Sequence, residues 1–315
     1  MKHNNVTITG SGSYLPVGVR SNTSISNNAN TTPKWIEENL GIFERRTIGE
    51  GEYPSDMAYE ATIKALENAN ITKEDLDMII VVTSSPEIIS PSIACVLNNK
   101  LGLKKNIPSF DMNAVCAGFV YAVSIASPLV SIGMYKNILI VATEAYSRIT
   151  DWGHRNSVFF GDGAGAVVLG HSEGGWISSE LSANGKDTGL TGFSLKHGEN
   201  YITNPKEVWD KAVDVLPKSI RKILHQNNTD VSEIDSFIPH QASINMLKHI
   251  CDEVGLPKDK LKTVMGKYGN IAGASIPIVL DEIRRSGDLQ YGSKVLLSAI
   301  GSGWVWGSIL MNYEK

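Results

Sequence analysis

Runs of apolar residues alternate along this chain with stretches in which apolar and polar residues follow a helical period. Five apolar runs predict buried strands, at residues 75–83, 136–143, 163–169, 233–240 and 293–299. Helical patterns follow two of them, at residues 91–101 and 242–254. Strands that are apolar throughout are typical of sheets covered on both faces, and their alternation with helices indicates βαβ units. The pattern therefore predicts an α/β protein.

The order of these elements is repeated. The strand at 75–83 with its helix corresponds to the strand at 233–240 with its helix. Two later runs correspond as well, residues 136–143 to 293–299 and residues 163–169 to 303–311. A repeat of this size is not the period of a solenoid. We therefore predict two pseudo-equivalent halves, 1–172 and 173–315, divided near residues 171–175.

One long segment, from Met112 to Tyr135, carries no charged residue. Its length would suffice to cross a bilayer. However, it contains Pro128 and several serines, and no flanking pattern of basic residues sets an orientation. A helix that is uncharged on every face is also typical of a protein core. We favour the buried core helix and expect no membrane insertion.

The composition limits the function classes. The chain has 315 residues, 42% hydrophobic and 20% charged, and a net charge of −4. That charge gives no case for nucleic-acid binding, which requires a basic patch. The three cysteines are far apart and the seven histidines are dispersed, so we expect no metal site. An odd cysteine count, and an N-terminus without the apolar core of a signal peptide, predict a reducing, cytoplasmic location.

Two glycine clusters resemble nucleotide-binding loops only in part. The segment Gly10–Pro16 lacks the third glycine of a dinucleotide fingerprint, and the segment Gly161–Gly165 lacks the Lys-Ser/Thr of a phosphate-binding loop. We interpret both as tight turns where strands meet a crowded centre.

The first candidate for chemistry is Cys116. It follows a strand-like run and precedes the uncharged helical segment, and the start of a helix stabilises a thiolate. Such settings lower a thiol pKa from ~8.5 to roughly 3.5–7.5. The alternative is a buried structural cysteine.

Two further segments favour the nucleophile. His240 lies at a strand-to-helix turn, and Asn270 lies in a loop after Gly269. Either residue alone would be read as structural. Together with Cys116 they form the pattern of a nucleophile with two polar partners brought together by folding.

The motifs resemble the β-ketoacyl-ACP synthase III family of the thiolase superfamily over nearly the whole chain. The matching stretches are Gly10–Pro16, Trp35–Ile36, Gly41–Ile42, Glu44–Arg46, Cys116–Phe119, Phe160–Gly165, Pro239–Ala242, Gly269–Asn270, Ala274–Pro277 and Gly301–Gly307. The resemblance implies a thiolase-like five-layer α-β-α-β-α fold built from two pseudo-duplicated halves. It also implies a homodimer.

The resemblance implies a reaction in two steps without a bound cofactor. An acyl group passes from acyl-CoA to Cys116, and a decarboxylative Claisen condensation with malonyl-ACP or malonyl-CoA follows. His240 and Asn270 would stabilise the enolate, and the N–H groups of Cys116 and Gly303 would form the oxyanion hole.

The family also suggests substrate-binding residues. Trp35 matches a tryptophan that stacks on the adenine of coenzyme A, and Arg155 stands near a second adenine-stacking position. Ser90 lies where an aromatic residue at the dimer interface often closes the acyl pocket. Glu87 is a candidate pocket acid, with a surface glutamate as the alternative.

The chain departs from the family at positions that are usually basic, where it has Asn39, Asp210 and Asn245. These changes favour a specialised fatty-acid, polyketide or secondary-metabolite pathway. A basic patch around Lys218, Arg221 and Lys222 would be a relocated docking site for the acidic carrier, or else an ordinary solvated face. Two alternatives remain for the function: an acyltransferase that forms an ester or amide without decarboxylation, and a subunit of a condensing heterodimer.

Overall fold

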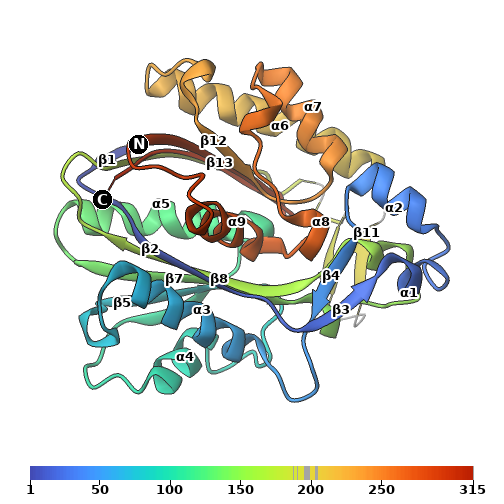
Figure 1. Ribbon diagram of the computed structural model, residues 1–315, viewed down its shortest axis with the longest axis horizontal. Helices are drawn as coiled ribbons and strands as arrows, with labels where there is room; N and C mark the ends of the chain where they lie inside the picture. The colour runs from blue at the N-terminus through green and yellow to red at the C-terminus, as the bar shows by residue number, and fades with distance from the viewer. Residues whose placement is uncertain (187, 190, 195–198, 203–204, 315) are drawn as a thin grey trace.

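The computed structural model describes residues 1–186, 188–189, 191–194, 199–202 and 205–314, and its frame is two five-stranded sheets (Figure 1). The first sheet has the order β2-β8-β7-β5-β6, with strands Thr7–Tyr14, Asp162–Gly170, Asn137–Ala145, Met78–Val82 and Ser109–Met112. The second sheet has the order β1-β9-β14-β13-β12, with strands Lys2–Asn4, Trp176–Ala183, Val305–Tyr313, Ser293–Gly301 and Ser236–Pro239.

The two sheets follow one plan. In the first, β5 is parallel to β6 and β7, whereas β8 is antiparallel to β7 and β2. In the second, β12 is parallel to β13, whereas β14 is antiparallel to β13 and β9. The predicted strands are therefore present, and the correspondence between the two series agrees with the pairing.

Helices form three layers around these sheets. Figure 1 shows α5 (Gly118–Ser131) and α9 (Ser275–Arg285) between the two sheets. The outer faces are covered by α3 (Pro54–Ala69) and α4 (Ile93–Leu101) on the first sheet, and by α6 (Pro205–Gln226) and α7 (Ile244–Val254) on the second. This α-β-α-β-α arrangement is the predicted fold.

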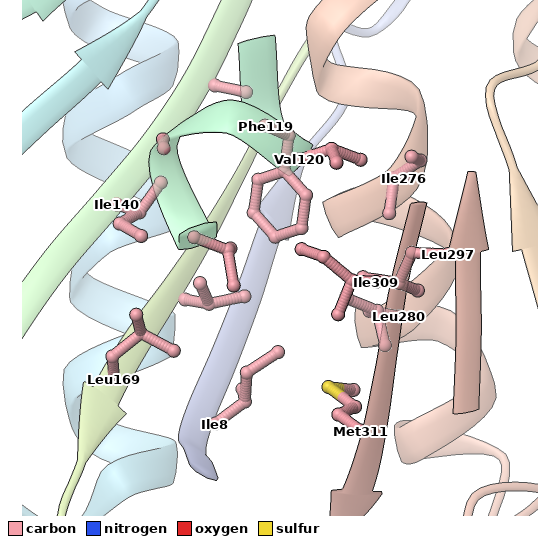
Figure 2. Close-up of a cluster of buried hydrophobic side chains, with 14 of the residues drawn as sticks. Ile8, Phe119, Val120, Ile140, Leu169, Ile276, Leu280, Leu297, Ile309 and Met311 are labelled. Carbon is pink, nitrogen blue, oxygen red and sulfur yellow. The ribbon is translucent and has the colours of Figure 1, made fainter. Parts of the chain in front are cut away.

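The core lies where α5 and α9 meet both sheets. Figure 2 shows its side chains, all buried, from the first sheet, the second sheet and the two central helices: Ile8, Ile140, Leu169, Leu297, Ile309, Met311, Phe119, Val120, Ile276 and Leu280. The uncharged sequence around α5 is thus explained by the apolar contacts of its buried residues, although Ile125 is 45% exposed. None of the described helices is long and apolar enough to cross a membrane, and α5 has 14 residues.

The prediction of turns at the two glycine clusters was wrong, because these glycines lie almost entirely inside strands β2 and β8. A Cβ on Gly12 would lie 2.4 Å from the carbonyl oxygen of Ala61 in α3, and a Cβ on Gly165 would lie 2.8 Å from the backbone nitrogen of Ile278 in α9. Glycine is required there because a helix backbone approaches the sheet directly.

The chain passes from the first sheet to the second between Gly170 and Trp176, where we placed the boundary between the halves. Strand β1 is an exception, since it precedes β2 in the sequence but pairs with β9 of the second sheet. The half 1–172 therefore contributes one strand to the sheet of the half 173–315, and the status of the halves as separate units stays a prediction.

A small cap, defined here as residues 18–47, covers one end of the molecule. It contains β3 (Gly18–Ser21), α1 (Asn22–Ser26), α2 (Pro33–Leu40) and β4 (Glu44–Thr47). Helix α2 begins where the Thr32 hydroxyl accepts a hydrogen bond from the Trp35 N–H, and its buried Ile36 packs with Leu247 of α7.

The remaining elements are α8 (Met265–Tyr268), β10 (Thr191–Ser194), β11 (Glu199–Ile202) and 3₁₀ turns at Lys73–Asp75, Val115–Ala117, Tyr146–Arg148, Arg155–Val158, Val231–Glu233, Lys258–Lys260 and Ala272–Ala274.

We expect Gly12→Ala to lower the free energy of unfolding by about 1–3 kcal/mol, because its methyl group must displace the α3 backbone. Denaturant unfolding measures this change. Gly185→Ala is the matched control, since a Cβ there meets no atom within 4 Å, and it should change stability by less than about 0.5 kcal/mol. Equal effects of the two substitutions would contradict the close-approach explanation.

Candidate active site

Cys116 lies in the 3₁₀ turn Val115–Ala117 that leads from β6 into α5. The turn is strained, because Val115 has a φ of 48° and a β-branched residue rarely adopts the left-handed region. The side chain of Asn113 supports the turn by accepting a hydrogen bond from the Val115 N–H at 3.1 Å. Cys116 is therefore partly buried and held at the start of the central helix.

The predicted fall in the Cys116 pKa is wrong for the substrate-free protein. Burial, followed by the negative charge of Glu144, raises the pKa of this thiol well above its ordinary range. The N-terminus of α5 acts in the opposite direction. The thiol form consequently prevails until something at the site offsets the burial.

His240 follows β12, where its backbone N–H donates to the carbonyl of Ser298 at 2.9 Å. The buried side chain of Gln241 fixes the turn by donating to the Pro239 carbonyl at 2.8 Å and accepting from the Val264 N–H at 3.1 Å. The predicted strand-to-helix turn is thus present.

The His240 imidazole is neutral at working pH. Burial lowers its pKa to about 4, and a hydrogen bond to the backbone of Ala272 opposes this shift. Its side chain is 6% exposed, and its buried Nδ1 has no partner among the described residues. A buried nitrogen without a partner is free to engage a substrate.

Asn270 is fixed through its backbone to the segment before β8. Its N–H donates to the Phe159 carbonyl at 2.8 Å, and its carbonyl accepts from the Gly161 N–H at 3.0 Å. Its side-chain Oδ1 accepts from the Ala272 N–H at 2.8 Å, which fixes the orientation of the amide. The Nδ2 group therefore remains as a donor, and it donates no hydrogen bond within the described part of the chain.

One short turn, Ala272–Ala274, brings the three residues together. It follows Asn270, its Ala272 contacts the His240 ring, and a Cβ on Gly273 would lie 3.1 Å from the carbonyl of Val115. Ala272 also has a left-handed φ of 40°. Segments far apart in the sequence thus lie together here, and the joint catalytic role of their three residues stays a prediction.

The glycine-rich segment after β13 reaches the same cluster through Gly301. A Cβ on Gly301 would lie 3.1 Å from the backbone nitrogen of Cys116, whereas a Cβ on Gly303 would contact only Val305. The oxyanion-hole assignment of Gly303 stays a prediction, as does that of the Cys116 N–H.

Trp35 and Arg155 lie against each other at the cap. The Arg155 guanidinium is 4.8 Å from the centre of the Trp35 ring, and Trp35 is partly exposed. The two residues predicted to stack on adenine are thus neighbours, although they come from α2 and from the 3₁₀ turn Arg155–Val158.

Ser90 and Glu87 lie on an exposed segment between β5 and α4. The Glu87 carboxylate accepts a hydrogen bond from the Ser55 N–H of α3 at 3.1 Å. This contact favours the surface-glutamate alternative. The acid that acts on Cys116 is instead Glu144, a residue that the sequence analysis did not select.

Arg45 is a second residue that the sequence analysis passed over, although it belongs to a matched motif. Its side chain is fully buried and donates to the Val158 carbonyl at 2.7 Å and to the Asn22 side chain at 2.8 Å. Its Cβ lies 3.1 Å from the positions that a Cβ would take on Gly161 and on Gly269. Arg45 therefore packs under both segments that hold Asn270.

The basic patch on α6 is engaged in ion pairs. Lys222 lies 2.9 Å from Glu180, Arg221 lies 3.6 Å from Glu253, and Lys218 pairs with Asp214. Asp210, at a position that is usually basic, likewise pairs with Lys206 at 2.5 Å. These pairs favour the solvated-face interpretation over a relocated docking site.

Two sequence families match this chain. The family described as 3-Oxoacyl-[acyl-carrier-protein (ACP)] synthase III matches residues 110–185, and the corresponding C-terminal family matches residues 224–313. The β-ketoacyl-[acyl-carrier-protein] synthase III of Clostridium acetobutylicum is 38% identical over 99% of this chain and all of its own length. The chain belongs to the 3-oxoacyl-ACP synthase III family. The Xylella fastidiosa (strain Temecula1) relative is 40% identical over 97% of this chain and 98% of its own.

Solved structures agree with this membership. The Aquifex aeolicus 3-oxoacyl-ACP synthase III matches with a TM-score of 0.94 and 35% identity over 98% of this chain and 100% of the other. The priming β-ketosynthase of the R1128 polyketide pathway matches with a TM-score of 0.92 and 29% identity over 99% and 97%. The thiolase-like fold is confirmed. The synthase III member described here is a condensing enzyme, an acyltransferase that forms a carbon–carbon bond.

We expect Arg45→Lys to slow decarboxylation of a malonyl thioester about tenfold or more, because a lysine cannot reproduce the hydrogen bonds to Val158 and Asn22 that hold this side chain under the Asn270 segments. The free energy of unfolding should fall by about 1–3 kcal/mol. Carbon dioxide release and denaturant unfolding measure the two effects. Arg46→Lys, at the neighbouring and more exposed position, is the control and should behave like the wild type.

Proposed function

We propose that this synthase transfers an acyl group from acyl-CoA to Cys116 and then condenses it with malonyl-ACP or malonyl-CoA, without a bound cofactor. The observation that carries the proposal is the pair of unengaged nitrogens, His240 Nδ1 and Asn270 Nδ2, next to the Cys116 turn. Neither group changes its charge between pH 5 and 8, so the Asn270 amide can donate throughout that range. The neutral His240 ring carries a single N–H, and it would donate to the substrate when that proton is on the nitrogen facing it. The names of the relatives support the acyl carrier protein as a partner.

In the first step the Cys116 sulfur attacks the carbonyl carbon of the acyl thioester. The new carbon–sulfur bond forms as the bond to the CoA sulfur breaks, and the thiol proton leaves with the CoA thiol. Backbone N–H groups near Cys116 would stabilise the oxyanion, with those of Cys116 and Gly303 as the assigned donors. The contact of Gly301 with the Cys116 nitrogen supports a close approach of this segment.

In the second step the malonyl group loses carbon dioxide, and the electron pair of the broken bond moves into an enolate. The negative charge on the thioester oxygen would be shared by His240 and Asn270. The enolate carbon then attacks the acyl-Cys116 thioester. The product is a β-ketoacyl thioester, and the Cys116 sulfur is released as the leaving group.

Trp35 and Arg155 would bind the adenine of the CoA donor. An aromatic face and a planar guanidinium both stack on a purine, and the two groups are 4.8 Å apart here. Adenine would therefore stack on this pair at the cap.

The charges at the positions that dock a carrier protein are the basis for proposing the acceptor and the pathway. At three positions where the family usually has basic residues that dock an acidic carrier, this chain has Asn39, Asp210 and Asn245. The basic residues Lys218, Arg221 and Lys222 of α6 form ion pairs with acidic side chains. Electrostatic steering of a general carrier protein would thus be weak. We therefore propose a specialised pathway, with a dedicated carrier or a free CoA thioester as acceptor.

We also propose a homodimer that forms through β6. This strand is an edge of the first sheet, and one row of its backbone groups has no strand partner among the described residues. Phe110 of this strand is exposed, and so are Ile88 and Ile89 in the segment that follows the neighbouring strand β5, the last being 80% exposed. Ser90 follows directly, so a partner would meet it there and the acyl pocket would be closed across the interface.

The two half-reactions should separate by residue. Cys116→Ala should form no acyl adduct yet release some carbon dioxide from a malonyl thioester, because His240 and Asn270 remain. Asn270→Ala should acylate Cys116 but decarboxylate about 10²–10³ times more slowly, because it loses a donor to the developing charge. Intact-mass analysis after an acyl-CoA pulse and a carbon dioxide assay measure these steps.

Parallel assays with malonyl-CoA and a malonyl carrier protein identify the acceptor. An adduct on Cys95 or Cys251 would overturn the nucleophile assignment. Decarboxylation by Asn270→Ala at the wild-type rate would instead favour an acyltransferase that forms an ester or amide, whereas no adduct and no carbon dioxide from the wild type would favour a heterodimer subunit.

Ser90→Phe should shift the substrate preference toward short acyl groups, because an added ring overfills the pocket at a cost of about 1–3 kcal/mol. The ratio of acylation rates for long and short acyl-CoA donors measures this shift. Sedimentation should give a dimer for both proteins. A monomer, or an unchanged chain-length preference, would contradict the proposed interface.

A further inference from the structure

Glu144 is a buried acid without a positive partner. It lies near the end of β7, is 0% exposed, and makes no ion pair with any described residue. A buried charge is costly unless hydrogen bonds replace its water. The synthase reaction as derived above assigns no role to this residue.

Hydrogen bonds from two loops surround the carboxylate. Ser84 donates through its backbone N–H at 3.1 Å and its hydroxyl at 3.0 Å, and the Ser85 hydroxyl donates at 2.5 Å. The backbone N–H of Gly273 donates from the other side. Glu144 therefore joins the segment after β5 to the turn that follows Asn270.

The Cys116 turn lies directly beyond Gly273. A Cβ on Gly273 would be 3.4 Å from Glu144 Oε1 and 3.1 Å from the Val115 carbonyl, so only a glycine separates the carboxylate from the backbone that precedes the nucleophile. Charges interact strongly at such short range where water is excluded.

We propose that Glu144 is a positioning residue for Cys116. Its carboxylate fastens the Ser84 segment and the Gly273 turn beside the nucleophile, and its negative charge, added to the effect of burial, opposes ionisation of the Cys116 thiol. This inference rests on the proposed role of Cys116 as the acylated residue.

The titratable groups that face Glu144 are Cys116 and Tyr146, whose hydroxyl lies 3.0 Å from the Ser84 hydroxyl. Burial raises the pKa of Glu144 to about 7, against the hydrogen bonds of Ser85, Ser84 and Gly273, and burial with the nearby charges raises the pKa of Tyr146 well above its ordinary range. Above about pH 7 Glu144 is the ionised member of this group, so its charge opposes formation of the Cys116 thiolate. Removing that charge must lower the thiol pKa.

The test is the pH dependence of Cys116 alkylation by iodoacetamide, followed by peptide mapping so that Cys95 is counted separately. Glu144→Gln should move the midpoint for Cys116 down by about one pH unit or more, and raise its rate near pH 7.5 about tenfold. Glu180→Gln is the matched control. Glu180 is also buried and accepts hydrogen bonds from serine hydroxyls, at Ser219 and Ser182, but it lies in the second sheet on β9.

A purely structural Glu144 would give a different result. Both variants would then lose thermal stability while the Cys116 profile stayed at the wild-type midpoint, and the proposal would be overturned. Glu144→Asp keeps the charge and should keep the wild-type profile. If Glu144→Gln does not fold, the alkylation profile of the wild-type protein still tests the proposal. A Cys116 midpoint below about pH 7 in the wild type would contradict it. Alkylation of Cys116 needs no malonyl substrate. The alkylation profile can therefore be interpreted even if the protein does not catalyse condensation.

Discussion

The burial of two helices between two sheets is the constraint on which the rest of this structure depends. Helices α5 and α9 contact both sheets, so their N-terminal turns open into the interior of the molecule (Figure 1). Each helix is preceded by a 3₁₀ turn that starts with a left-handed residue other than glycine, Val115 in one and Ala272 in the other. The strain is tolerated because packed elements surround both turns. The nucleophile and the polar groups meet there for this reason.

Burial also fixes the charge of each group at the site. It lowers the pKa of His240 to about 4 and so keeps this ring neutral, and it raises the pKa of Glu144 to about 7. Arg45 is fully buried, and its pKa falls only to about 10, so it stays charged and holds the segments around Asn270. The low-dielectric centre thus combines groups that would titrate very differently in water.

Prediction from the sequence succeeded where a residue's role depends on neighbours in the chain. The strands, the central helix and the motifs around Cys116, His240 and Asn270 are local patterns, and all occur where expected. Prediction failed where the role depends on contacts across the fold. The glycines of β2 and β8 were predicted to form turns, but they lie in strands where the absence of a side chain lets a helix backbone pack closely. The Cys116 pKa was predicted from the adjacent helix alone, whereas burial raises it.

The sequence by itself determined the α/β class, the repeated plan, the family resemblance and the three polar residues of the cluster, because hydrophobic period and motif spacing are properties of the chain. Only the tertiary structure decided that Glu144 and Arg45 are buried next to the segments of the site and that Glu87 lies at the surface. Glu144 follows an apolar strand and Glu87 follows another, so the sequence offers no distinction between them. Their difference is the environment that folding provides, a water-free contact beside Gly273 for one acid and solvent for the other.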